Sequence, residues 1–114
     1  MALKSLSTGF INIDAAGTIQ RVTAAETDPT VAIRCHSIRF EARAGNAGLI
    51  YVGNSALVVA TGVGLFAQLA IPTDNITPSF TVTLVQSPNG FNLADFYVDA
   101  SVTNDDVLVT YLVL

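Results

Sequence analysis

Charged residues are scarce in this sequence. Of its 114 residues, 12% are charged and 51% are hydrophobic, whereas a typical globular domain carries about 25% charged residues. This balance excludes a disordered chain, because such chains combine low hydrophobicity with high charge. Five Lys and Arg residues stand against nine Asp and Glu residues, which gives a net charge of −4. We therefore expect no nucleic-acid partner, since binding to phosphates requires clustered basic side chains.

Cysteine and histidine are equally rare, with Cys35 and His36 the single residue of each type. One cysteine excludes an intrachain disulfide and a CxxC motif, and one histidine excludes a multi-histidine zinc site within the chain. The two residues together are a candidate nucleophile–base pair. Neighbours in a β-strand point to opposite faces, however, so we expect a buried thiol beside an outward histidine. The sequence thus predicts no enzyme and no catalytic, metal or cofactor site.

We also expect no secretory signal, because no apolar run follows Lys4. Residues 49–71 contain no charged side chain, and such a length would suffice for a membrane helix. Turn-like breaks at 53–55 and 62–64 and short runs of Val, Ile and Leu favour strands instead. We expect no membrane partner. So few charges on a small domain indicate apolar surface that is covered by another copy of the chain.

Alternating hydrophobic residues predict one all-β domain over residues 1–114, with about eight or nine short strands. Residues 9–14 and 18–23 have hairpin spacing. The apolar positions change from odd to even near Ser37, which predicts a β-bulge or a break between two strands. The other strands are expected within residues 31–43, 49–52, 57–60, 65–71, 80–84, 95–99 and 107–114. This pattern favours an antiparallel, jelly-roll-like β-sandwich, with a closed barrel as the alternative.

The strand predicted at residues 107–114 is apolar on both faces and contains neither Lys nor Pro. Exposed edge strands usually carry such residues, because an unprotected edge invites aggregation. The strand is therefore expected to be central in a sheet or buried against a neighbouring subunit. Together with apolar residues of two other predicted strands, it supplies the candidate interface residues. These are Phe10, Ile11, Leu65, Phe66, Leu108, Leu112 and Leu114.

Two charged groups are candidates for ion binding. The acidic group consists of Asp95, Asp99, Asp105 and Asp106, with Asn104. It lacks the DxDxDG spacing of a calcium loop, and Asn104-Asp105 favours a turn between strands, so a hairpin turn is the preferred interpretation. The basic group consists of Arg34, Arg39 and Arg43, beside Glu41. We expect surface or interface ion pairs there rather than an anion site.

Four segments carry a resemblance to a known class of proteins. They are residues 38–42, 46–54, 92–101 and 107–111, and they contain the patterns N-x-G-x-(I/V)-Y-V-G and L-x-D-(I/F)-Y-V. In these motifs the chain resembles small all-β virion proteins of tailed bacteriophages, which include capsid decoration, or cement, proteins. Residues 1–30 lie outside the motifs, and the resemblance suggests for them a capsid-gripping arm or hairpin.

The resemblance implies a homotrimer that is assembled in the host cytoplasm and binds the major capsid protein on the outside of a phage head, which it stabilises. The candidate interface residues would then meet another copy or the shell. The alternative is a receptor- or glycan-binding or structural module of a head fibre, tail or baseplate. Sugar binding would require exposed aromatic rings, for which Phe91 and Tyr97 are the candidates. The absence of tryptophan favours the capsid role.

Overall fold

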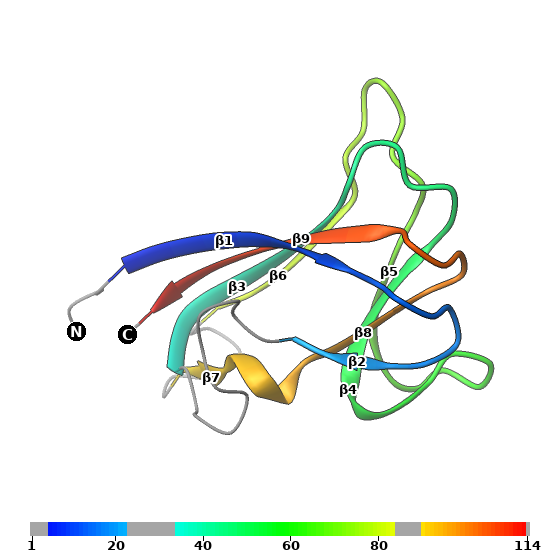
Figure 1. Ribbon diagram of the computed structural model, residues 1–114. Helices are drawn as coiled ribbons and strands as arrows, with labels where there is room; N and C mark the ends of the chain where they lie inside the picture. Colours follow the sequence, from blue (N-terminus) through cyan, green and yellow to red (C-terminus); the bar gives the residue numbers. More distant parts are fainter. Residues whose placement is uncertain (1–4, 23–33, 84–89, 114) are drawn as a thin grey trace.

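Two antiparallel β-sheets face each other in the computed structural model, which describes residues 5–22, 34–83 and 90–113 (Figure 1). The elements are β1 (Ser5–Asn12), β2 (Gln20–Arg21), β3 (Arg34–Ala42), β4 (Ile50–Val58), β5 (Val63–Leu69), β6 (Ser79–Val82), β7 (Phe91–Asn92), the short 3-10 helix η1 (Leu93–Asp95), β8 (Tyr97–Ala100) and β9 (Asp106–Val113). One sheet has the strand order β1-β9-β3-β6, and β7 pairs with β3. The other sheet has the order β2-β8-β4-β5.

This strand order is that of a jelly roll. With the two-residue β7 set aside, the chain pairs as one long antiparallel ribbon: β1 with β9, β2 with β8, β3 with β6 and β4 with β5. The ribbon is rolled up, so that β9 also pairs with β3 and β8 also pairs with β4. Successive parts of the ribbon thereby fall alternately in the two sheets. The predicted jelly-roll-like β-sandwich is confirmed.

The core forms where the inward side chains of the two sheets meet. In β3, Ile38 and Phe40 are fully buried, and in β9 Val107 is fully buried as well. They belong to one buried cluster with Val52 and Val98 of the opposite sheet. Alternate residues of a strand share one face, and burying one such side chain contributes about 1.5–3 kcal/mol. The alternating apolar pattern is therefore the main source of stability for this fold.

The predicted irregularity near Ser37 is a β-bulge in β3. Cys35 pairs with Val113 of β9, whereas Ser37 pairs with Leu112, so His36 is the extra residue on this strand. The bulge shifts the inward face by one position, and Cys35 and Ile38 are both fully buried. The extra residue at the bulge therefore explains why the apolar positions change from odd to even numbers in the sequence.

Two local predictions were wrong. Residues 9–14 and 18–23 do not form a hairpin, because β1 pairs with β9 and β2 pairs with β8 in the other sheet. Residues 53–55 do not end a strand either. Instead, β4 continues through them with shifted pairing to β5. Glycine is needed at position 53 because Gly64 lies so close that an added Cβ would overlap its carbonyl oxygen.

The uncharged stretch predicted to form strands builds the hairpin of β4 and β5. In the ranges that the structure describes, no helix is long and apolar enough to span a membrane. The parts of the predicted strands at 31–33 and at Leu84 lie outside the described residues.

Candidate functional site

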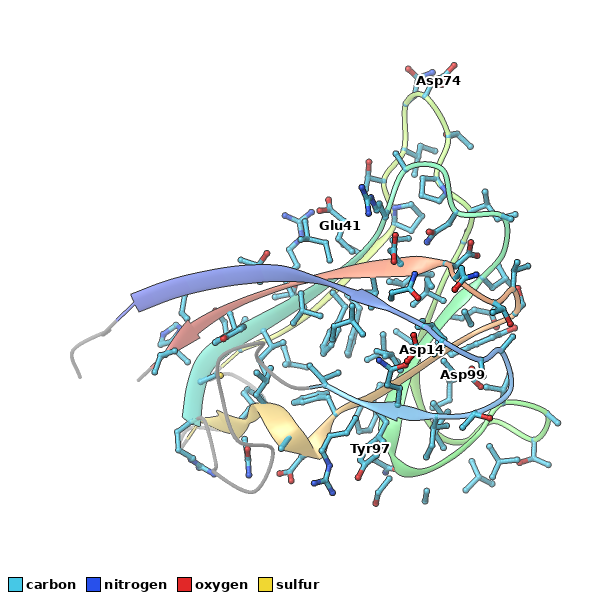
Figure 2. All side chains as sticks on the ribbon, viewed as in Figure 1. Asp14, Glu41, Asp74, Tyr97 and Asp99 are labelled. Atoms are coloured by element: carbon cyan, nitrogen blue, oxygen red, sulfur yellow. The ribbon has the colours of Figure 1, made fainter. Side chains whose placement is uncertain are left out.

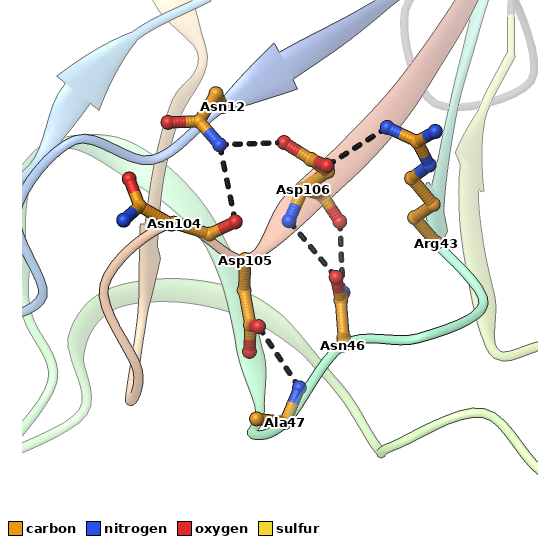
Figure 3. Close-up of polar contacts among 7 residues, drawn as sticks. All are labelled: Asn12, Arg43, Asn46, Ala47, Asn104, Asp105 and Asp106. Carbon is orange, nitrogen blue, oxygen red and sulfur yellow. Dashed lines mark hydrogen bonds and ion pairs between the residues drawn. The ribbon is translucent and has the colours of Figure 1, made fainter.

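A polar cluster joins the start of β9 to the loop between β3 and β4 (Figure 3). The carboxylate of Asp105 accepts hydrogen bonds from the backbone N–H groups of Ala47, at 2.9 Å, and Gly48, at 2.8 Å. The residue is only 6% exposed. Hydrogen bonds to an ionised group are stronger than those between neutral groups, so this carboxylate holds the loop firmly against β9.

Asn46 and Asp106 extend the same cluster. The amide of Asn46 donates to the Asp106 carbonyl oxygen at 2.8 Å and accepts from the Asp106 N–H at 2.9 Å. The Asp106 carboxylate accepts from Arg43 at 2.9 Å and from the Asn12 amide at 2.8 Å. We call Asn12, Arg43, Asn46, Asp105 and Asp106 the clasp. It connects β1, the β3–β4 loop and β9.

The clasp gives two carboxylates of the acidic group a structural role. Asp105 and Asp106 are bonded within the protein, and Asn104 adopts φ 71° in the turn between β8 and β9. The described residues contain no group of three or more His, Cys, Asp or Glu side chains placed to hold a metal ion. The predicted turn is present, but the expected hairpin is wrong, because β8 pairs with β2 and β4 whereas β9 pairs with β1 and β3 in the other sheet. Asp95, in η1, lies outside the clasp.

The glycine of the N-x-G motif is required by close packing. A Cβ on Gly48 would overlap the Ser101 hydroxyl oxygen and lie 2.8 Å from a Val102 methyl carbon. The Ser101 hydroxyl is itself held, because it accepts a hydrogen bond from the Leu49 N–H at 2.8 Å. Since Asn46 belongs to the clasp, both residues that define this motif serve the fold.

The fourth carboxylate of the acidic group, Asp99, also has a structural role. It lies in β8 (Figure 2). Its side chain is buried, with 2% of the residue exposed. One oxygen accepts from the N–H of Gly17 at 3.0 Å and from that of Ala100 at 2.8 Å. The turn that carries the chain from β1 to β2, and so from one sheet to the other, is fastened by this contact.

Cys35 and His36 do not supply an activated nucleophile. Burial raises the pKa of the Cys35 thiol to about 11, although the charge of Arg34 lowers it in part. The thiol therefore stays protonated near neutral pH, and the thiolate is the reactive form. His36 is half-buried at the bulge, and its Nδ1 has no hydrogen-bond partner among the described residues. The predicted buried thiol is confirmed.

The basic residues form ion pairs at the surface, as expected. Arg39 contacts Glu41 at 3.2 Å, and Arg43 contacts Asp106 at 2.9 Å. The arginine side chains are 52% and 49% exposed, so solvent screens both pairs and each contributes at most about 1 kcal/mol. Arg34 lies elsewhere, at the start of β3.

The candidate interface residues fall into two separate groups. Leu108 and Leu112 are half-buried on the outer face of β9, which is central in its sheet. Phe10 occupies the register position opposite Leu108, whereas Ile11 packs against the core. Leu65 and Phe66 lie on β5, the edge strand of the other sheet. Leu114 and the side chain of Phe10 lie outside the description.

A hollow of about 880 Å³ adjoins the edge strands β5 and β6, which belong to opposite sheets. Its apolar lining comes from Leu65, Phe66, Phe80, Val82, Phe91 and Phe96. Phe96 is 4% exposed and holds the rings together, with centroid distances of 5.9 Å to Phe66 and 6.2 Å to Phe91. Phe66 itself is 47% exposed. The hollow therefore presents a partly open aromatic surface, in which the exposed Phe66 ring is held by the buried Phe96 ring.

Polar side chains border this hollow and continue beyond it. Asn54 and Asp95 line it and also line a second hollow of about 350 Å³. In the second hollow Arg21 lies over the ring of Tyr97, 5.5 Å from its centroid, and donates to the Tyr97 hydroxyl at 2.8 Å. Tyr97 faces away from the β1–β9 sheet (Figure 2). We call the two adjoining hollows the groove, with an apolar half at Phe66 and a polar half at Tyr97.

Local turns position two amides along the groove. Asn54 lies at the irregular part of β4, where its side-chain oxygen accepts from the Ala56 N–H at 2.9 Å. Gly64 packs directly against it, so that a Cβ there would overlap this oxygen. Asn92 caps η1 by accepting from the Ala94 N–H at 3.1 Å. Both amides are therefore fixed in orientation by the backbone.

The sequence pointed to only part of the groove. Phe91 and Tyr97 were the predicted candidates for exposed rings and both line it, but Phe66 was expected at an interface. Asn54 and Asn92 were not singled out. Each lies two residues before the backbone N–H that it binds, which is the spacing of an Asx turn and the one signal that marks them.

The fold and these sites define a jelly-roll β-sandwich with a structural polar clasp and an open, aromatic-lined groove. A comparison with protein-family models finds no match to the chain, and no curated protein sequence matches it.

Proposed function

We propose that this protein is a structural virion protein that decorates the outside of a phage head and stabilises it as an oligomer. The observation that carries the proposal is the outer face of β9, where Leu108, Thr110 and Leu112 form an uncharged strip at the centre of a sheet. Apolar residues on the outer face of a central strand are typical of a contact surface. Jelly rolls are common among viral capsid domains, an analogy of fold alone.

Further apolar surface supports an oligomer. Val58, Val63 and Phe66 on the β4–β5 hairpin are 47–54% exposed, and Ile76 in the loop before β6 is 63% exposed. A small protein present in many copies can stabilise a shell because its weak contacts act together. A closed symmetric assembly is the usual form of such a protein, and we propose the trimer.

The experiment that tests the capsid role measures copy number. Particles of the source phage are purified, and the ratio of this protein to the major capsid protein is determined by quantitative mass spectrometry. A simple lattice fraction supports decoration. A handful of copies per particle would contradict it and favour a fibre, tail or baseplate, and absence from particles would contradict any virion role.

A second measurement tests the proposed contact face. Leu112→Lys places a charge on the outer face of β9 without touching the core, and Asp74→Lys changes the charge of an exposed loop tip far from β9 (Figure 2). We expect Leu112→Lys to reduce the trimer to smaller species in multi-angle light scattering, while Asp74→Lys leaves the mass unchanged. A Leu112→Lys protein of parental mass would refute the role of this face.

The groove favours a second candidate function, that of a receptor- or glycan-binding module on a fibre, tail or baseplate. The specific observation is the half-exposed Phe66 ring beside the polar side chains of Asn54 and Asp95. Jelly rolls also occur among lectin domains.

A further inference from the structure

The hydrogen-bonding groups along the groove are only partly used within the protein. The side-chain oxygens of Asn54 and Asn92 accept backbone hydrogen bonds, but their amide nitrogens donate to no described residue. The exposed carboxylate of Asp95 accepts from none of the described residues either. The groove thus offers two oriented donors and one strong acceptor.

These groups line the same hollow as an apolar platform. Phe66 exposes almost half of its surface and rests edge-on against Phe96, with an angle of 71° between the ring planes. Ligand pockets generally combine such an apolar surface with a few polar groups that fix orientation. Because Phe96 is buried and contacts Phe40 and Phe91 as well, Phe66 needs little reorganisation to bind a ligand.

The charges of the groove exclude several ligand classes. Asp95 lies at the junction of the two halves and would repel a phosphate or carboxylate there. Arg21 in the polar half would repel a cation there. A purely apolar ligand would cover Asp95 and the two amides without providing hydrogen bonds, which is costly.

We propose that the groove binds a neutral oligosaccharide. A sugar ring has an apolar C–H face that fits an aromatic ring, and a rim of hydroxyl groups that both donate and accept hydrogen bonds. One ring lies on Phe66, where its hydroxyls accept from Asn54 and Asn92 and donate to Asp95. The chain continues toward the polar half, where the Tyr97 hydroxyl, fixed by Arg21, meets the next ring.

The pre-set orientation of the two amides is part of this inference. A flexible side chain loses rotational freedom when it binds a ligand, and this loss costs about 0.5–1.5 kcal/mol for each side chain. Because Asn54 and Asn92 are already held by Ala56 and Ala94, most of that cost is absent. Weak individual contacts to hydroxyl groups then suffice for specific recognition.

The test begins with the purified parent protein on an array of neutral and sialylated oligosaccharides and bacterial surface polysaccharides. The best neutral oligosaccharide is then titrated by isothermal calorimetry. We expect Phe66→Ala and Asp95→Ala each to weaken binding by about tenfold or more. Val58→Ala removes a side chain of the same 47% exposure outside the groove and should leave the affinity within about twofold.

Three results would overturn the inference: binding of no neutral saccharide, preference for acidic glycans, or unchanged affinity in both groove variants. Should Phe66→Ala fail to fold, Phe66→Leu and Asp95→Asn provide the same comparison. The inference deepens the second candidate function and rests on it for its biological setting. The two are distinguished because the array measures binding by the isolated protein, whereas copy number in particles measures its place in the virion.

Discussion

The clasp and the groove are built from the same kinds of residue, and their difference lies in where the hydrogen bonds go. In the clasp, the Asp105 carboxylate accepts two backbone N–H groups, and the Asn46 amide both donates and accepts. In the groove, Asn54 and Asn92 use one side of their amides, and Asp95 is exposed. Buried polar groups must be paired within the protein, so the clasp is committed to the fold and the groove is available to a ligand.

The strongest test of this comparison is Asp105→Ala. It removes a carboxylate that accepts two backbone hydrogen bonds in a buried position, and we expect the free energy of unfolding to fall by about 3 kcal/mol. Urea denaturation at a fixed protein concentration measures the change. Asp74→Ala, in an exposed loop, is the matched control and should change stability by less than about 0.5 kcal/mol. A loss below about 1 kcal/mol for Asp105→Ala would show that the clasp is not structural.

Gly48→Ala tests the packing beneath the clasp. The new methyl group would collide with Ser101 and Val102, and overpacking of this kind costs about 2 kcal/mol. Ala47→Ser, at the exposed neighbouring position, should have an effect below about 0.5 kcal/mol. The two variants are compared by their urea midpoints. If the two variants had equal urea midpoints, the β3–β4 loop could move to accommodate the methyl group. That result would contradict the structural role assigned to the N-x-G motif.

The core beside the groove is probed by pH. Because burial raises the folded-state pKa of Cys35 from 9.0 to about 11, the unfolded chain releases the thiol proton first as the pH rises. The protonated Cys35 thiol therefore contributes fully to the free energy of unfolding below pH 9, and this contribution is lost between pH 9 and 11. From pH 8 to 10 the loss is about 1 kcal/mol. Denaturation curves of the parent and of Cys35→Ala over this range isolate the effect. Parallel pH dependence in the two proteins would show that the thiol ionises as easily in the folded state as in the unfolded one.

The smallest effect on stability is expected from Asp95→Asn in the groove. Its carboxylate is exposed and accepts no hydrogen bond from a described residue, so the free energy of unfolding should stay within about 0.5 kcal/mol of the parent value. Urea denaturation beside Asp105→Ala gives a direct contrast between two aspartates. A loss above about 1 kcal/mol would make Asp95 a structural residue and remove the distinction between the regions.

The sequence predicted best the features that depend on neighbouring residues. The parity of the apolar positions predicted a bulge or break near Ser37, next to the bulge that the structure has at His36, and the turn chemistry of Asn104 located the turn before β9. Strand alternation indicated a sandwich because each half-buried strand needs an opposite layer.

Features that depend on distant partners were missed. Gly53 was interpreted as a turn residue because the close approach of Gly64 has no local signature. The groove combines Asn54 of β4 with Phe66 of β5, Phe80 of β6 and Asp95 of η1, and no single stretch of sequence contains it. The hairpin spacing before β2 was misleading, since a jelly roll sends that turn across the layers.

The position of β9 between β1 and β3 has a consequence for biosynthesis. Eight residues of β1 pair with β9, and β9 is a central strand of this sheet. The sheet therefore forms only when the two ends of the described chain come together. During synthesis, β1 and β3 are made long before β9. Until β9 is available, the edges of β1 and β3 that pair with it stay unpaired. Contacts between residues so far apart in sequence make folding slow. This sheet therefore completes its pairing only after β9 has been synthesised, and a delay in supplying β9 exposes two unpaired strand edges to aggregation.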